Sequence, residues 1–301
     1  MTLQRQFTLP ISTPRAAVDL AGSGKLVVLE TPSVMQRAGY VLANPWKNYL
    51  LPAEWLKQLI GSSRSPLIAE SQVRPGGWRS MELIYANEQP VDLVDKQALR
   101  DNPISIASRN RRRIVIGVLT ELIAKYEAES RVILLGVGAG PGRHIQEAIE
   151  QSKIETSRVA AYLIDRDDDA FAFGQALASR AGISDCVHFI KGDARQIGRV
   201  LPQVSPHIVK LVGIVEYLTD PELLDLLRAL RRVMAPGGSL VTHGLVDAYK
   251  TRRFLSRVFN LKHHRRSAGH VRSILRSAGF RPVDCVNEPM GIYPILTALR
   301  E

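Results

Sequence analysis

The second half of the chain alternates between short apolar runs and longer stretches in which apolar residues recur at helical spacing. The apolar runs lie at 131–137, 159–164, 186–190, 208–215 and 239–243, and the helical patterns at 142–151, 168–181, 194–201 and 220–234. Fully apolar strands separated by helices are typical of a parallel sheet that is covered on both faces. The pattern therefore predicts a doubly wound α/β sheet.

Both ends of this alternating region differ from its middle. Before it, a long helix is predicted from Pro103, with apolar residues at helical spacing such as Ile114 and Val118. After it, VRSILRSAGF predicts a helix that ends at Gly279, and RPVDCVNEP and GIYPILTAL predict two strands joined by a short turn. We expect these last two strands to form an antiparallel hairpin at the sheet edge.

Residues 1–102 have no such repeat, and prolines and glycines cut them into short pieces. A strand is predicted at Lys25–Glu30, and two more at Ser80–Tyr85 and Pro90–Val94 around a polar turn. We therefore expect an N-terminal accessory or lid region over 1–102 and a main domain over 103–301. Four aromatic residues are candidates for a wall of the substrate site: Trp46, Tyr49, Trp55 and Trp78.

A glycine-rich segment, GVGAGPG, directly follows the first of the parallel strands and precedes a helix. Glycines there let a ligand approach the backbone, and the helix N-terminus offers unpaired N–H groups. A phosphate loop of the Walker type would need Gly-Lys-Ser/Thr, whereas Arg143 and His144 follow here. The alternative interpretation is a tight turn without a ligand.

Carboxylates end the next two strands. Asp165 ends VAAYLID, about 20 residues after the glycines, where it can accept hydrogen bonds from ribose hydroxyls. Asp193 ends CVHFIKGDA and points to the same crevice at the carboxyl ends of the strands. Each of these residues could instead cap the helix that follows it.

In this order, GVGAGPG, LID, GDA, GIVEYLTD and MAPGGSLV resemble the motifs of class I S-adenosylmethionine-dependent methyltransferases over about residues 104–301. AGPGRHIQEAI and HHRRSAGHVRSILRSAGF are further similar to a little-characterised group of bacterial methyltransferases. The resemblance implies a seven-stranded, mostly parallel Rossmann-like sheet with an antiparallel terminal strand. It also implies S-adenosylmethionine as the methyl donor and 103–301 as the methyltransferase domain.

The resemblance assigns roles to individual residues. The implied cofactor contacts are Gly136, Gly138, Gly140, Gly142, Asp165, Asp193, Ala194 and Glu216. Glu216 and Tyr217 would line the wall between cofactor and substrate, so they are also the catalytic candidates. The family often has an acidic residue near the cofactor's amino group where this chain has Gly136. Either another carboxylate such as Glu216, or carbonyls and water, would take its place.

Rival functions are weaker matches to these motifs. A nicotinamide dehydrogenase would not explain Gly-Asp-Ala or the terminal hairpin. The histidines lack metal-site spacing, and no nucleophile elbow such as GxSxG is present, so we expect no metal. Two alternatives stay open: transfer of the cofactor's aminobutanoyl or aminopropyl arm, and a non-catalytic binding module on the same fold.

The composition indicates the cellular compartment. The longest apolar runs are shorter than the roughly 18 residues of a membrane span, and the N-terminus lacks the apolar core of a secretory signal. The 301 residues include only two cysteines, which fits a reducing, cytoplasmic compartment.

The formal net charge of +11 favours an anionic partner. One basic cluster, RNRRR, contains Arg109 and Arg111–Arg113, and a second spans Lys250–Arg266. The second cluster makes Arg252 and Arg253 candidates for substrate contacts. We expect a small-molecule or lipid substrate, with nucleic acid or an anionic membrane surface as further candidate partners; a merely solvated basic face is the alternative.

Overall fold

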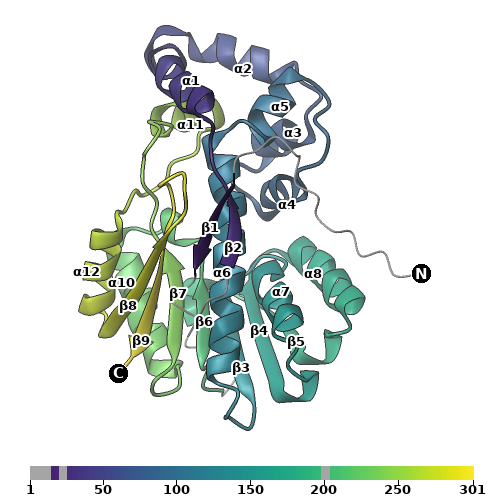
Figure 1. Ribbon diagram of the computed structural model, residues 1–301, viewed down its shortest axis with the longest axis vertical. Coiled ribbons are helices and arrows are strands. Elements are labelled where there is room, and N and C mark those ends of the chain that lie inside the picture. The colour runs from purple at the N-terminus through teal and green to yellow at the C-terminus, as the bar shows by residue number, and fades with distance from the viewer. Residues whose placement is uncertain (1–14, 20–25, 198–203) are drawn as a thin grey trace.

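The computed structural model describes residues 15–19, 26–197 and 204–301, and its core is a seven-stranded sheet (Figure 1). The strand order is β5-β4-β3-β6-β7-β9-β8, with β9 antiparallel to both of its neighbours and all other pairs parallel. The strands are β3 (Val132–Val137), β4 (Val159–Asp165), β5 (Val187–Lys191), β6 (Ile208–Leu211), β7 (Ser239–His243), β8 (Phe280–Asn287) and β9 (Pro294–Arg300).

Helices cover both faces of this sheet, as the apolar strands predict. One apolar core joins the sheet to α6 (Pro103–Lys125), α7 (Arg143–Ser152) and α8 (Asp168–Ala181). A second core joins the other face to α10 (Asp220–Val233) and α12 (Ala268–Ser277). The predicted doubly wound sheet and its terminal antiparallel hairpin are therefore confirmed.

Two predicted elements of the main domain differ from the structure. The strand expected over 208–215 ends at Leu211, because the chain bends there into the 3-10 turn Val215–Tyr217. Of the helix expected over 194–201, the described part begins with the 3-10 turn Ala194–Gln196, and the rest lies largely outside the described residues.

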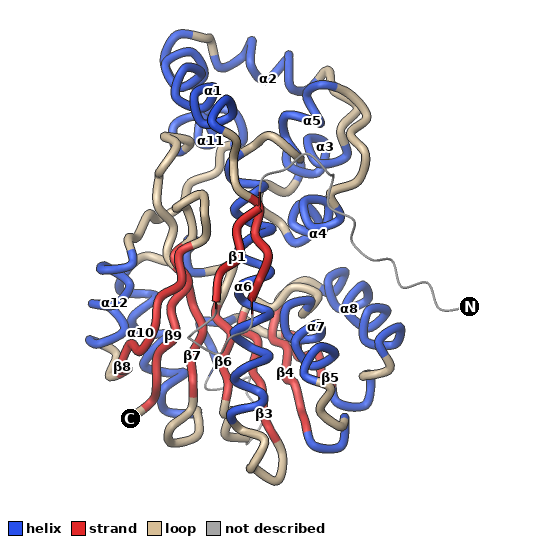
Figure 2. The backbone as a smooth tube through the Cα atoms, in the orientation of Figure 1, coloured by secondary structure: helices blue, strands red, loops and turns tan. Residues whose placement is uncertain are grey.

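A second layer, which we call the cap, lies beyond the carboxyl ends of the strands (Figure 2). It contains α1 (Val34–Pro45), the π-helical turn Trp46–Leu50, α2 (Ala53–Gly61), α3 (Pro66–Val73), α4 (Trp78–Ala86), α5 (Leu93–Leu99) and α11 (Arg252–Phe259). A two-stranded antiparallel sheet, β1 (Arg15–Asp19) and β2 (Leu26–Glu30), lies beside α6. Within the described ranges, no helix is both long and apolar enough to cross a bilayer.

The strands predicted at Ser80–Tyr85 and Pro90–Val94 are wrong, because the first segment lies within α4 and the second runs from an irregular stretch into the first residues of α5. Ile84 and Tyr85 are buried and Met81 packs beside Ile84, which is a three- and four-residue spacing rather than a two-residue alternation. Met, Glu and Leu also favour helix over strand. The strand predicted at Lys25–Glu30 is confirmed by β2.

Helix α6 joins the cap to the sheet. Arg109 on α6 is buried, and its guanidinium donates to the Glu30 carboxylate at the end of β2, at 2.6–3.1 Å. Arg113 also pairs with Glu30, at 2.9 Å. The RNRRR cluster is therefore not a solvated basic face, because its arginines lie between packed elements.

Candidate active site

The glycine segment forms a loop between β3 and α7 at the carboxyl edge of the sheet. Gly138, Gly140 and Gly142 all have positive φ angles, of +56°, +54° and +74°. A Cβ on Gly138 would lie 2.0 Å from Ile214, and one on Gly142 would lie 2.1 Å from Leu163. Glycine is therefore required at these positions by both conformation and space.

Asp165 fixes this loop to the end of β4. One of its carboxylate oxygens accepts a hydrogen bond from the Gly140 N–H at 2.6 Å, and the other accepts from the Arg166 N–H at 2.7 Å. Asp193, after the neighbouring strand β5, accepts from the Arg195 N–H and so caps the turn that contains Ala194. The structure thus brings the predicted cofactor residues to one edge, while their ribose and adenine contacts stay predictions.

At Gly136, the acidic side chain that the resemblance leads one to expect would be crowded by its neighbours. A Cβ at this position would lie 3.0 Å from each of Ala139, Ile145 and Leu163, which all belong to the packed core. A carboxylate near the cofactor's amino group would have to come from another element.

Helix α4 of the cap covers the start of α7 and the loop after β4. The Trp78 indole N–H donates to Asp167 at 3.0 Å, and the Cβ of Trp78 lies against Gly140. Glu82 accepts from Arg143 at 2.7 Å. Of the four aromatic residues proposed for a substrate wall, Trp78 lies at the crevice, whereas Trp46, Tyr49 and Trp55 are exposed on the outside of the cap.

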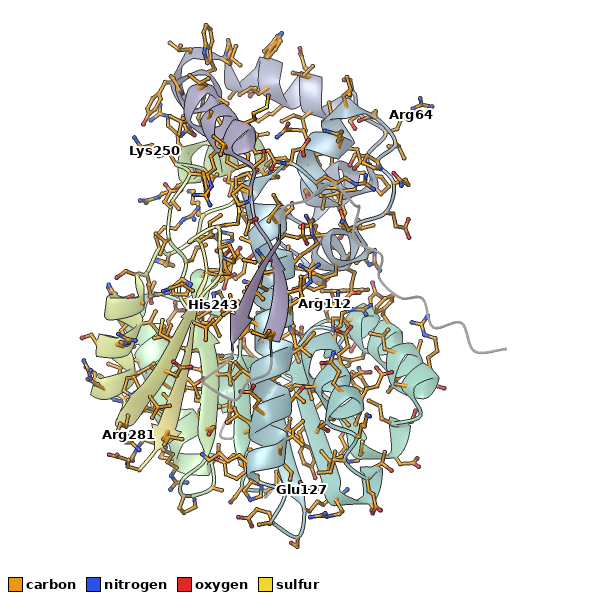
Figure 3. The ribbon with its side chains drawn as sticks, in the orientation of Figure 1. Arg64, Arg112, Glu127, His243, Lys250 and Arg281 are labelled. Atoms are coloured by element: carbon orange, nitrogen blue, oxygen red, sulfur yellow. The ribbon has the colours of Figure 1, made fainter. Side chains whose placement is uncertain are left out.

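A group of buried polar side chains lies beneath the cap, at the carboxyl ends of β6 and β7. We call Arg111, Lys210, Glu216 and His243 the buried charge cluster. Glu216 lies 3.7 Å from the Arg111 guanidinium and 3.3 Å from Nε2 of His243, and Arg111 stacks on the Tyr293 ring at 4.3 Å. Figure 3 labels His243 at this level of the molecule.

The electrostatics of the cluster favour an ionised Glu216. Burial alone would raise the pKa of Glu216, but the charges of His243 and Arg111 outweigh burial and hold the pKa well below its usual range. Within the described part of the chain, one Glu216 carboxylate oxygen and two Arg111 nitrogens, Nε and Nη1, have no hydrogen-bond partner. Buried polar atoms of this kind usually have partners, so these atoms are suited to a ligand.

Lys210 adds a second buried cation to the cluster. Its Cα pairs with Gly136 across β3 and β6, and its residue is only 3% exposed. Burial, together with the charge of Arg111, lowers the pKa of Lys210 to about 8. No carboxylate lies within 4.0 Å of its ammonium in the described ranges. The buried charge cluster therefore holds two cations, Arg111 and Lys210, against the carboxylate of Glu216, and the charge of Asp165 also acts on Lys210.

His263 lies beside the predicted catalytic candidate Tyr217, with ring centroids 4.8 Å apart. Burial lowers the pKa of His263 to about 4, and its Nε2 has no partner among the described residues. His263 is thus half-buried, whereas its neighbour His264 is exposed. A neutral imidazole with a free ring nitrogen can accept a proton at pH 7.

Arg252 and Arg253, the predicted substrate contacts, lie on α11 in the cap. Nε of Arg253 donates to the Asn48 carbonyl at 2.8 Å, and Arg252 is exposed. A cavity of about 700 Å³ lies between α1, α11 and the start of α6. Its lining includes Tyr40, Lys47 and Arg109 but none of the glycine-loop residues.

No sequence pattern identifies Lys210, His243 or His263 as site residues, because each belongs to a different segment and only the fold brings them together. Arg111 was visible as part of a basic cluster, but its burial was not. Among the described residues, no three His, Cys, Asp or Glu side chains are placed to hold a metal ion together.

The chain matches one methyltransferase family in sequence and several solved structures in fold. A family model described as "Putative methyltransferase" matches residues 80–300. No curated protein matches the chain. A structure from Bordetella parapertussis, described as a possible exported protein, superposes with a TM-score of 0.66 at 17% identity, covering 88% of this chain and 96% of that one.

Two methyltransferase structures are also similar in fold. Magnesium protoporphyrin IX methyltransferase from Synechocystis PCC 6803, with bound S-adenosylhomocysteine, has a TM-score of 0.54 at 14% identity and covers 74% of this chain and 94% of that one. An O-methyltransferase family 2 protein from Planctomyces limnophilus, in complex with apigenin, has a TM-score of 0.51 at 17% identity, with 76% and 68% covered. These similarities establish the fold.

Proposed function

The chain belongs to the family described as "Putative methyltransferase", and we propose that it transfers a methyl group from S-adenosylmethionine to an oxygen, nitrogen or carbon of its substrate. The observation that carries this proposal is the buried charge cluster beside the glycine loop. Its atoms without a hydrogen bond to a described residue are two nitrogens of Arg111 and one carboxylate oxygen of Glu216, which lies 3.3 Å from Nε2 of His243.

These donors and acceptors fit the amino-acid end of S-adenosylmethionine. Glu216 would hold the ammonium group, and so replace the acid that is absent at Gly136, while Arg111 and Lys210 would hold the carboxylate. Asp165 would accept from the ribose hydroxyls, and Asp193 would lie near the adenine. When bound, S-adenosylmethionine supplies an electrophilic methyl group on its sulfonium.

The remaining residues would order the substrate and exclude water. Helix α4 closes over the crevice through Trp78, and exclusion of water favours transfer over side reactions. His263, with its unpartnered Nε2, would accept the proton of a substrate hydroxyl or amine.

Calorimetric titration with S-adenosylmethionine tests the cofactor, and mass spectrometry of the turnover products tests the transferred group. We expect binding, and S-adenosylhomocysteine as the product. Methylthioadenosine would instead indicate transfer of the aminobutanoyl or aminopropyl arm. The absence of binding at millimolar ligand would refute the proposal.

A further inference from the structure

The outer face of α1 is apolar. Val34, Met35, Val41 and Leu42 are 66–86% exposed, and they form two adjacent pairs seven residues apart, which places them on one side of the helix. An amphipathic helix normally turns this side toward a protein core. Here it faces away from the rest of the chain.

The apolar surface continues onto the next two elements. Nine of the sixteen exposed large apolar residues in the described ranges fall between residues 34 and 59, so they are concentrated rather than scattered. We call them the cap face: Val34, Met35, Val41, Leu42, Trp46, Tyr49, Leu50, Trp55 and Leu59. This face lies at the end of the molecule formed by α1 and α2 (Figure 1).

The outward orientation of the cap face is fixed by packing on its other side. The opposite side of α1 carries Gln36, Tyr40 and Ala43, which line the cavity between α1 and α11. The buried Asn48 amide donates to the Lys250 carbonyl and accepts from the Phe254 N–H, which holds the π-helical turn against α11. Rotating α1 to bury its apolar side would break these contacts.

The cap face is bordered by positive charge. Residues 31–65 and 247–262 contain nine lysines and arginines but only two acids, Glu54 and Asp247. Figure 3 labels Arg64 and Lys250 at this end of the molecule. A second copy of the chain would bring like charges together, whereas an anionic surface would complement them.

We propose that the cap face docks on a membrane surface rich in anionic phospholipid. Its tryptophans and tyrosine are the side chains that partition to the bilayer interface. Apolar burial and attraction of basic residues to anionic lipid act together in such binding. The inference does not depend on the methyl-transfer reaction.

Sedimentation of the full chain with vesicles tests the proposal. The vesicles contain equal parts of phosphatidylglycerol and phosphatidylcholine, or phosphatidylcholine alone. We expect binding to the anionic vesicles, loss of at least about tenfold in affinity for Met35→Ser with Leu42→Ser, and weaker binding as salt rises. Both side chains are exposed, so the variant should fold.

The matched control is Val73→Ser with Leu93→Ser, which removes side chains of comparable exposure outside the cap face, and it should bind as the parent does. Tryptophan emission should shift to shorter wavelength on the anionic vesicles, and Trp46→Phe with Trp55→Phe should abolish the shift. Equal binding by both serine variants would overturn the proposal. So would a folded parent that binds no vesicle, whether it dimerises through the cap face or binds RNA instead.

Discussion

Replacing Lys210 with methionine should stabilise the protein and weaken its hold on the cofactor. The pKa of Lys210 is lowered from 10.5 to about 8, and each pKa unit corresponds to about 1.4 kcal/mol. Keeping the ammonium charged in this buried place therefore costs about 3 kcal/mol at neutral pH. Methionine has a similar volume and carries no charge, so Lys210→Met should recover up to about this amount.

The pH dependence has a defined sign. Because the folded pKa is depressed, the cost is fully present below about pH 8 and disappears as the pH rises toward the unfolded value of 10.5. The stability difference between Lys210→Met and the parent should therefore shrink from about pH 8 upward. Urea unfolding at a series of pH values measures this stability difference. The control is Lys262→Met, which changes an exposed lysine and should show no such change with pH.

Lys210→Met should lower the cofactor affinity even though it raises the stability of the protein. Loss of a charged hydrogen bond to the cofactor carboxylate costs about 1.5–3 kcal/mol, or roughly 10- to 150-fold in affinity by calorimetry. If Lys210→Met destabilises the protein at pH 7, Lys210 has a partner that the structure does not show. If it leaves cofactor affinity unchanged, the carboxylate is held elsewhere.

Three further predictions concern the same crevice. Gly138→Ala should lower the free energy of unfolding in urea by about 2–5 kcal/mol, because it adds left-handed strain to an overlap with Ile214. The control Gly182→Ala has a similar φ but no atom within 4 Å, so it should lose only about 1 kcal/mol. Asp165→Ala should reduce cofactor affinity by about 1–3 kcal/mol in calorimetry, because the Gly140 N–H also loses its acceptor; unchanged affinity would contradict this. The pKa of His263 is lowered from 6.5 to about 4, so its contribution to stability is present above about pH 6.5 and is lost toward pH 4. His263→Gln should remove this part of the acid sensitivity in unfolding titrations. An unaltered pH profile would show that the ring is hydrated.

Much of the fold was predictable because it rests on periodic apolar patterns and strand-end motifs. The order of GVGAGPG, LID and GDA placed Asp165 and Asp193 at one edge, and the terminal hairpin followed from two apolar runs. The strands predicted at 80–85 and 90–94 are wrong because runs of five or six residues of mixed polarity fit both a strand and a helix, and packing against the rest of the cap decides between them.

The buried charge cluster was harder to predict for a different reason. Lys210 lies within an apolar strand run, and nothing in its neighbourhood of the sequence indicates that Arg111 and Glu216 lie near it. Arginines in a run normally suggest a solvated surface. Only the course of α6 across the sheet shows that Arg109 and Arg111 are buried.

Helix α6 also limits how this protein can be divided or recombined. Arg109 is bound to Glu30 on one side of the helix, and two residues later Arg111 approaches Glu216. Replacing the first hundred residues with a segment that has no carboxylate at the position of Glu30 would leave Arg109 buried without its counter-ion, an arrangement that costs about 3–5 kcal/mol. A chimera divided between these two residues should therefore be stable only if it keeps an acid at the position of Glu30 opposite the arginine at 109.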